Sequence, residues 1–290
     1  MAKNEISDYI TFPKTFESYR WYKPIIVFIL FFIIMIILSG ITVFVTSQIF
    51  GPHFMNVLFS KNTEFRHDAV AFFFSNFMIF LIVPSLYLAS KIVKDRPFSS
   101  YTSLSGKWNH KLYFKSLAIP LILFLIYVVV DATLFGTTGK FEFSLPILIA
   151  AIISIPLQCI AEEYAFRGFL MQTLGSWLNI PVLALIIQAV IFAVVHGYGS
   201  FATISIFILG AACGFFTWKT DGLEVGSALH TANNLSLGIL LSFGIETLPT
   251  LSLAALAEGT FFILLISAAT YYVGKKTEWF GELPQNSQNA

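Results

Sequence analysis

Long apolar runs alternate with short polar connections along this chain. A membrane-spanning helix needs about 20 predominantly apolar residues, and eight stretches approach this pattern. They lie at residues 25–47, 69–90, 113–135, 145–171, 181–198, 201–219, 223–243 and 251–274. The pattern predicts an all-α polytopic membrane protein with about eight transmembrane helices and polar ends. The first run carries no charge and is too long for a signal-peptide core, so we interpret it as a retained anchor.

Basic residues in the connections indicate the orientation of the chain, because cytoplasmic loops carry an excess of Lys and Arg. With both ends in the cytoplasm, the inside regions contain Lys3, Lys14, Arg20, Lys23, Lys91, Lys94, Arg96, Lys107, Lys111, Lys115, Lys219, Lys275 and Lys276. The outside regions contain Lys61, Arg66 and Lys140. This bias predicts an N-in, C-in topology with an even number of spans, either six or eight.

The composition supports a membrane protein and excludes several other classes. Hydrophobic residues make up 57% of the chain and charged residues 11%, whereas soluble domains contain about 25% charged residues. The net charge of +1 argues against a basic nucleic-acid binder and against an acidic disordered tail. The two cysteines, Cys159 and Cys213, lie in apolar runs and do not form a disulfide framework.

Ionisable residues inside apolar runs are costly and usually functional. The candidates are Asp131, Glu162, Glu163, Arg167, His196, His230 and Glu258. Five of these seven fall between positions 162 and 230. This clustering is the most informative feature of the sequence, and it indicates one polar site inside the membrane domain.

Two adjacent glutamates and an arginine occupy the fourth apolar run. Glu163 and Arg167 are four residues apart with the acid on the N-terminal side, which is the better order for an ion pair on one helix face. Glu162 points about 100° away and has no basic residue three or four positions further on. We therefore expect Glu162 to be protonated or to have a partner on another helix. The structural alternative is an ion network that packs helices together.

Two later runs each place a histidine four residues from another side chain. Phe192 and His196 share one helix face, and so do His230 and Asn234. A His and an Asn that face the same way provide two hydrogen-bond donors, which can stabilise an oxyanion during acyl transfer. The alternatives are a core histidine bonded to a backbone carbonyl for His196, and interhelical hydrogen bonding for His230 and Asn234.

A turn in the connection 172–180 would bring these helices together. Gly175 and Pro181 suit such a turn. The middle of this connection lies between Glu162 and His196 in the sequence, somewhat closer to Glu162. In an antiparallel hairpin the two side chains would then lie within about two helical turns of the same level.

The candidate residues suit two kinds of hydrolytic chemistry. A carboxylate and an imidazole that converge on one water form a general base, and Glu162 and His196 are the candidates. His230 and Asn234 would hold the developing oxyanion, so an amide can be cleaved without a covalent intermediate. Alternatively, Glu162, His196 and His230 would bind a divalent metal, with zinc the first candidate, and leave an open position for water. The sequence leaves both alternatives open.

Together the three segments resemble the signature of the CAAX protease and bacteriocin-processing family (CPBP, also called Abi), which includes the type II CAAX prenyl endopeptidases. That signature is E-E-x-x-x-R, F-x-x-x-H and H-x-x-x-N on successive membrane helices. Here it reads Glu162-Glu163 with Arg167, Phe192 with His196, and His230 with Asn234. Each motif alone is weak, but all three in order, each in an apolar segment, are specific. No H-E-x-x-H or G-x-S-x-G motif competes with this interpretation.

The resemblance implies an eight-span intramembrane endopeptidase with a cavity that opens to the cytoplasm. It assigns water activation to Glu162 and His196, the oxyanion site to His230 and Asn234, and structural support to Glu163, Arg167 and Phe192. The predicted organisation is a cytoplasmic segment (1–24), about three transmembrane helices (25–144), a CPBP/Abi-like catalytic membrane core (145–245), a last transmembrane helix (246–275) and a polar tail (276–290).

The expected partners are the lipid bilayer and a membrane-associated peptide or protein substrate, with no nucleic acid. The Phe-, Ile- and Lys-rich composition suits a low-GC bacterium, and hence an integral protein of the bacterial cell membrane. The alternative function is a non-enzymatic immunity or binding protein that protects against a bacteriocin. A transporter is disfavoured because neither an inverted repeat nor paired broken helices are visible.

Overall fold

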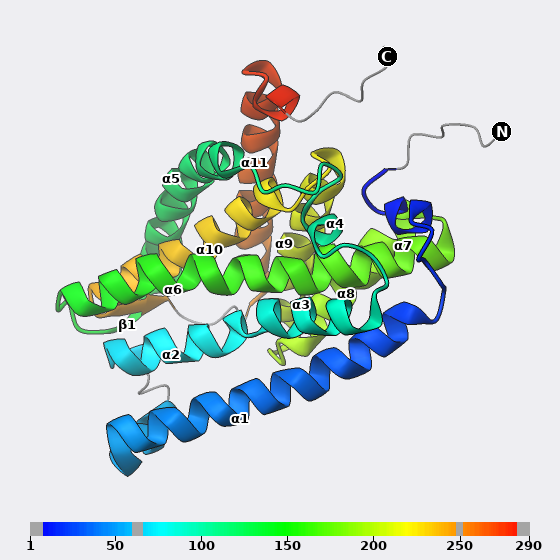
Figure 1. The fold of residues 1–290 in the computed structure, drawn as a ribbon. Coiled ribbons are helices and arrows are strands. Elements are labelled where there is room, and N and C mark those ends of the chain that lie inside the picture. The colour runs from blue at the N-terminus through cyan, green and yellow to red at the C-terminus, as the bar shows by residue number, and fades with distance from the viewer. Residues whose placement is uncertain (1–7, 60–65, 248–251, 283–290) are drawn as a thin grey trace.

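The computed structural model describes residues 8–59, 66–247 and 252–282, and this part of the chain is almost entirely helical (Figure 1). The long helices are α1 (Lys23–Leu58), α2 (Ala69–Phe80), α3 (Ile82–Val93), α5 (His110–Phe135), α6 (Leu145–Glu163), α8 (Pro181–Val195), α9 (Ser200–Lys219), α10 (Glu224–Ser242) and α11 (Leu253–Lys276). The shorter elements are η1 (Phe12–Thr15), α4 (Ser99–Thr102), the π-helical η3 (Tyr164–Met171), α7 (Gln172–Leu178) and η4 (Trp279–Glu282). Strands β1 (Thr137–Gly139) and β2 (Ile245–Thr247) form one antiparallel pair. Lys3 and Lys61, two of the residues used for the orientation, lie outside the described residues.

Polar residues start the helices where the apolar pattern begins. The Asp68 carboxylate accepts hydrogen bonds from the backbone N–H groups of Val70 and Ala71, which starts α2. Asn109 and Ser144 cap α5 and α6 in the same way. Such caps satisfy backbone N–H groups that have no partner inside the helix. The observed helices therefore begin within a few residues of the predicted runs.

The membrane-protein prediction is confirmed, but six rather than eight helices are long and apolar enough to cross a bilayer in the described residues. They are Lys23–Leu58, Ala69–Val93, His110–Phe135, Leu145–Leu178, Ser200–Lys219 and Leu253–Lys276. Helix α8 has 15 residues and is about 22 Å long, shorter than a hydrocarbon core of about 30 Å. Helix α10 is less apolar than these six, because it carries His, Asn, Ser and Thr side chains. The N-in, C-in orientation stays a prediction.

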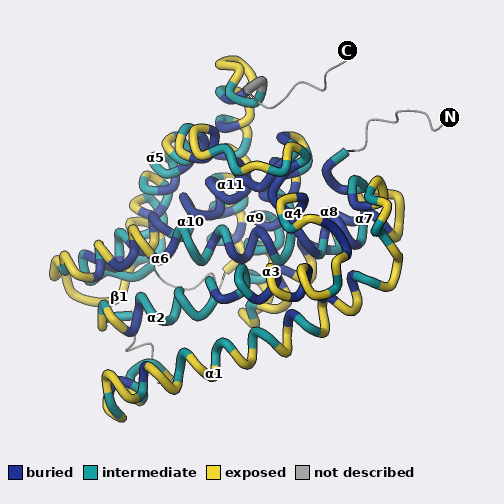
Figure 2. The backbone as a smooth tube through the Cα atoms, viewed as in Figure 1, coloured by how far each residue is buried: buried dark blue, intermediate teal, exposed yellow. Residues whose placement is uncertain are grey.

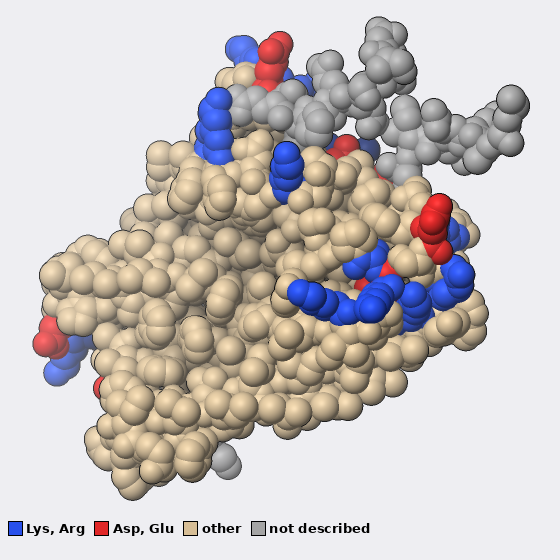
Figure 3. Space-filling model, in the orientation of Figure 1, with Lys and Arg blue, Asp and Glu red and all other residues tan. Residues whose placement is uncertain are grey.

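The polar helix α10 lies inside the bundle, shielded by apolar helices. All of its residues from Glu224 to Ala232 are buried, and it packs against α5, α6 and α9. By contrast, Figure 2 shows α1 mostly as exposed or half-buried chain. Its exposed side chains include the large apolar residues Phe32, Ile36 and Phe44. Figure 3 shows charged side chains gathered near the ends of the helices, with wide uncharged faces between them. We therefore expect lipid to contact the outer helices, whereas the polar residues of α10 lie in the centre of the bundle.

The predicted turn lies within 172–180, but at the end of this connection rather than near Gly175. The helix continues through α7 to Leu178, and Asn179 ends it with a φ of 55°. Gly175 lies inside this helix, where an added Cβ would come within 2.6 Å of the Ile10 carbonyl oxygen. The glycine therefore permits close packing of the N-terminal segment, and Asn179 makes the turn because its short polar side chain tolerates a left-handed conformation.

Candidate active site

The corrected turn explains how the first two motifs meet. Asn179 lies midway in the sequence between Glu162 and His196. Because α7 and α8 run in opposite directions from that turn, the two side chains reach the same level. Glu162 also lies where α6 passes into the π-helical segment η3. Such segments are rare in proteins, and those that occur are often found at functional sites.

The Glu162 carboxylate lies between two imidazoles. Its Oε1 accepts a hydrogen bond from Gln158 Nε2 at 2.8 Å. Its Oε2 lies 4.0 Å from His196 Nε2 and 3.7 Å from His230 Nε2. This oxygen is buried and has no hydrogen-bond partner among the described residues. Both separations exceed those of direct hydrogen bonds, so neither imidazole is a direct partner of this oxygen.

The backbone determines which nitrogen of His196 faces this space. His196 Nδ1 lies 2.6 Å from the Phe192 carbonyl oxygen. A carbonyl oxygen only accepts, so Nδ1 carries the hydrogen and Nε2, on the Glu162 side, keeps its lone pair in the neutral ring. The Phe192 ring also contacts the imidazole edge-on, with centroids 4.6 Å apart. The four-residue spacing in this motif thus serves both to hold the imidazole and to fix its tautomer.

Glu163 links the first motif to the third. Its Oε1 accepts from Arg167 Nη1 at 2.8 Å, as the spacing predicted, and also from His230 Nδ1 at 2.9 Å. The Arg167 guanidinium is fully buried, donates to the Gly210 carbonyl at 2.7 Å and lies over the Phe192 ring at 4.5 Å. The contacts to His230 and Gly210 were not predicted, because they join helices far apart in the sequence and leave no signal in helical spacing.

Asn234 lies beside the second ring nitrogen of His230. Asn234 Nδ2 is 3.4 Å from His230 Nε2, and its Oδ1 accepts from Asn233 Nδ2 at 2.9 Å. Because Nδ1 of His230 is held by Glu163, Nε2 faces both Glu162 and the Asn234 amide. The sequence did not indicate that Gln158 donates to Glu162 or that Asn233 donates to Asn234. Asp131 and Glu258, the other two ionisable residues predicted inside the membrane, lie on α5 and α11, outside this cluster.

The distances within the cluster also bear on the metal alternative. Glu162, His196 and His230 offer nitrogen and oxygen donors of the kinds that zinc takes, and tetrahedral zinc places such atoms about 3.4 Å apart. The separations of 3.7 and 4.0 Å are wider. Within the described ranges, no group of three or more His, Cys, Asp or Glu side chains is arranged to hold a metal ion. The cluster as arranged is wider than a tetrahedral zinc site, and we derive no step through a metal.

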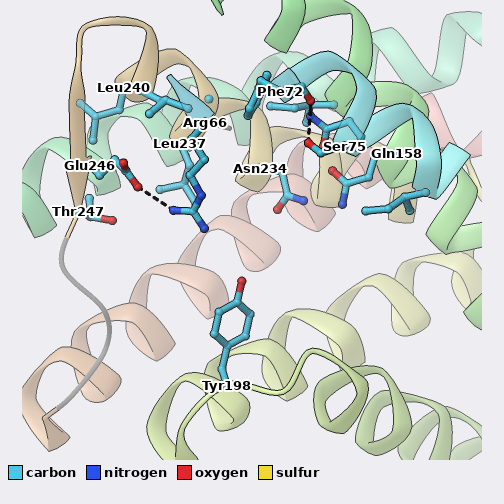
Figure 4. A pocket seen from close by; sticks show the side chains of 15 residues that line it. Arg66, Phe72, Ser75, Gln158, Tyr198, Asn234, Leu237, Leu240, Glu246 and Thr247 are labelled. Carbon is cyan, nitrogen blue, oxygen red and sulfur yellow. Dashed lines mark hydrogen bonds and ion pairs between the residues drawn. The ribbon is translucent and has the colours of Figure 1, made fainter. Parts of the chain in front are cut away.

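A cavity of about 440 Å³ reaches this cluster, and Asn234 and Gln158 form part of its wall (Figure 4). The cavity lies between α2, α6 and α10, and Tyr198 from the connection after α8 faces it. Its other end reaches Arg66 and Glu246, in connections predicted to lie outside the cell. Under the predicted orientation this end faces outward, whereas the resemblance implied a cytoplasmic opening.

Gly226 provides a test of how closely α10 packs against α9. An added Cβ at Gly226 would lie 2.6 Å from Thr217 Oγ1 and 2.9 Å from the Cys213 carbonyl oxygen. We expect Gly226→Ala to lower the free energy of unfolding by about 1–3 kcal/mol, because α10 must move away from α9. Thermal unfolding in detergent measures this effect. Gly40→Ala on α1 is the control, since nothing lies within 4 Å of its Cβ; a loss there as large as at Gly226 would contradict the packing argument.

The fold and the buried cluster define an integral multi-pass membrane protein with a polar site between its helices. Residues 143–236 match the model of the family described as "Type II CAAX prenyl endopeptidase Rce1-like". The match includes all three motifs and confirms the predicted resemblance. The chain is also 26% identical over 200 residues to "Uncharacterized protein YyaK" of Bacillus subtilis (strain 168), an alignment that covers 64% of this chain and 67% of that protein. The family match supports an enzyme of the protease type.

Proposed function

We propose that the protein is an intramembrane endopeptidase that hydrolyses a peptide bond of a membrane-associated protein or peptide. The observation that carries this proposal is the position of Glu162 Oε2, a buried carboxylate oxygen between His196 Nε2 and His230 Nε2 beside a cavity. Glu163 Oε2 is also buried without a hydrogen-bond partner, so the feature that sets Glu162 apart is that its free oxygen faces two imidazole nitrogens.

Glu162 and His196 activate the water in this proposal. One of the two bases, the Glu162 carboxylate or the lone pair on His196 Nε2, takes a proton from the water as its oxygen attacks the peptide carbonyl carbon. The same proton then passes to the nitrogen of the departing amine. The water's oxygen and remaining hydrogen stay on the new carboxyl group, so the step needs no covalent enzyme intermediate.

His230 and Asn234 face the developing oxyanion. The Asn234 amide supplies one donor. His230 supplies a second from Nε2 when its ring is protonated, and the Glu163 carboxylate at Nδ1 stabilises that imidazolium. Donors held in place by a buried network require little rearrangement during the reaction, which is the condition for strong transition-state stabilisation.

The substrate test compares membrane peptides from cells that produce the wild-type chain or Glu162→Gln. We expect at least one membrane protein to appear as a shorter product only with the wild-type chain. Identical peptide sets in the two strains would contradict the proposal, and bacteriocin protection that survives both Glu162→Gln and His196→Ala would favour the immunity function instead.

The metal alternative is decided by a separate measurement. The wide donor spacing leads us to expect that cleavage by the purified protein persists after treatment with a chelator. Metal analysis of the same sample is the companion measurement. Loss of cleavage on chelation, with recovery on adding zinc, would make the Glu162, His196 and His230 set a metal site.

A further inference from the structure

Another cavity, of about 460 Å³, lies between the start of α1 and the end of α3. The carbonyl of Lys94, the residue that ends α3, accepts a hydrogen bond from Lys23 Nζ at 2.9 Å, so α1 begins at the level where α3 ends. Both helices belong to candidate membrane spans, Lys23–Leu58 and Ala69–Val93. The cavity is therefore expected at the depth where the hydrocarbon core of a bilayer meets the lipid headgroups.

Aromatic and apolar side chains around the cavity indicate the same level. Trp21, Tyr22 and Tyr87 are exposed at this end of the two helices, as is typical of the aromatic belts that form at membrane–water interfaces. Leu88 and Ile92 are four residues apart on α3 and are both exposed, so they share one helix face. They give an acyl chain an apolar surface to lie along, next to the polar cavity.

The wall of this cavity carries an excess of positive charge. Its charged residues are Lys91, Lys94 and Arg96, and none of the residues that line it is acidic. The charge of Arg96 is offset by Asp95, whose Oδ2 lies 3.6 Å from Arg96 Nε. Lys91 and Lys94 are exposed, and they account for the excess. Figure 3 shows Lys and Arg side chains gathered in a row over this end of the molecule.

The two lysines hold their ammonium groups in different ways. Lys91 Nζ donates to the Tyr87 hydroxyl at 3.0 Å and lies 5.2 Å from the centre of that ring. An ammonium has three donors, so two remain for a ligand. Lys94 has its backbone fixed, with a φ of 52° and its carbonyl bonded to Lys23, while its side chain is exposed. One cation is thus positioned at the wall and the other can close over a bound anion.

Contacts with the helix that carries Glu162 hold the cavity wall in place. Phe98 stacks on Tyr164 with ring centroids 5.3 Å apart and an interplanar angle of 5°. Arg96 Nη2 donates to the Gly168 carbonyl at 3.3 Å. Tyr164 and Gly168 both belong to η3, which begins two residues after Glu162. The cavity is therefore preorganised, which lowers the cost of binding, and its ligand contacts residues that pack on η3.

We propose that this cavity binds the phosphate of an anionic phospholipid from the adjoining leaflet, with an acyl chain along Leu88 and Ile92. Basic pockets between the ends of membrane helices bind lipid headgroups of this kind. A zwitterionic headgroup brings its own cation close to the two lysines, so a net negative charge is favoured. A soluble anion has no acyl chain to contact the apolar face of α3. The proposal is independent of the endopeptidase function.

Native mass spectrometry of the purified full-length protein tests this site. The probes are phosphatidylglycerol, which is anionic, and phosphatidylcholine, which is zwitterionic, with the same acyl chains. We expect the first phosphatidylglycerol to bind about tenfold more tightly than phosphatidylcholine. Lys91→Gln/Lys94→Gln should remove nearly all of this preference, whereas Lys91→Arg/Lys94→Arg should keep it because both charges remain. Lys94→Gln alone, which preserves the contact of Lys91 with Tyr87, should lower the preference about three- to fivefold.

Lys275→Gln/Lys276→Gln is the matched control. It removes two exposed lysines at the end of another candidate span, and Lys276 lies 5.6 Å from the Tyr272 ring, much as Lys91 lies by Tyr87. Neither of these lysines lines the cavity, so this variant should keep the preference. Thermal unfolding in phosphatidylcholine checks that all variants are equally folded.

Three outcomes would overturn the inference. Equal binding of the two lipids by the wild-type chain would show that the cavity does not select for negative charge. An equal loss in Lys275→Gln/Lys276→Gln and in Lys91→Gln/Lys94→Gln would show a general attraction to a basic surface. Displacement of phosphatidylglycerol by an equal concentration of inorganic phosphate would make the cavity a site for soluble anions.

Discussion

Replacing Glu162 with Gln is expected to lower the rate of peptide cleavage by about 10²- to 10⁴-fold, the range that a positioned general base contributes. The amide has nearly the same shape as the carboxylate and can still contact Gln158. It cannot take a proton from water, and it removes the negative charge that faces both imidazoles. The measurement is the initial rate of cleavage of a substrate found by the peptide comparison, with the purified protein in vesicles.

Glu258→Gln is the control for this change. It neutralises another glutamate in an apolar helix, and this helix, α11, lies outside the catalytic cluster. We expect it to leave the cleavage rate within about twofold of wild type, since surface and peripheral changes usually have small effects. Thermal unfolding of both variants shows whether a loss of cleavage arises from a loss of folded protein. Full activity of Glu162→Gln would contradict the proposed mechanism.

Arg167→Gln is expected to destabilise the protein by about 3–5 kcal/mol, the cost of removing one partner of a buried ion pair. Arg167 and Glu163 are both fully buried, so the change leaves the Glu163 carboxylate in a medium of low dielectric. The Gly210 carbonyl also loses its shorter hydrogen bond at 2.7 Å and keeps the one from Gln188 Nε2 at 3.3 Å. Equilibrium unfolding in mixed detergent measures the free-energy difference.

The double variant Glu163→Gln/Arg167→Gln separates the charge from the shape of these side chains. Because it removes both charges together, we expect it to be more stable than Arg167→Gln alone. Arg20→Gln, which changes an exposed arginine, should shift stability by less than about 0.5 kcal/mol. A double variant less stable than either single change would show that the ion pair does not account for the loss.

Much of the architecture could be predicted from local pattern alone. Apolar runs set the helices because a bilayer requires every backbone polar group to be satisfied within the segment. The spacing of Glu163 and Arg167 correctly indicated a contact, since residues four apart meet on one helix face. The resemblance of the three motifs was confirmed over residues 143–236. The catalytic roles assigned to Glu162, His196, His230 and Asn234 stay predictions.

Local pattern failed where a residue's environment came from distant segments. Gly175 indicated a turn, but in the structure it is a helical glycine against which Ile10 packs. The length of α8 and the polarity of α10 reduced the predicted eight spans to six helices, among the described residues, that meet the criteria for crossing a membrane. A helix shielded by others tolerates polar side chains that lipid would exclude, so apolar content alone could not separate spanning from enclosed helices.

The sequence by itself determined that the chain is an all-α membrane protein and which acids, imidazoles and amide belong to one polar region, because helical periodicity and the cost of burying charge act within a single segment. Only the tertiary structure decided that Glu163 holds His230 as well as Arg167, that Glu162 lies between two imidazoles, and that the cavity extends to Arg66. These contacts join α6, α8, α10 and the β2 strand, and their distances depend on how whole helices pack, which no spacing within one helix encodes.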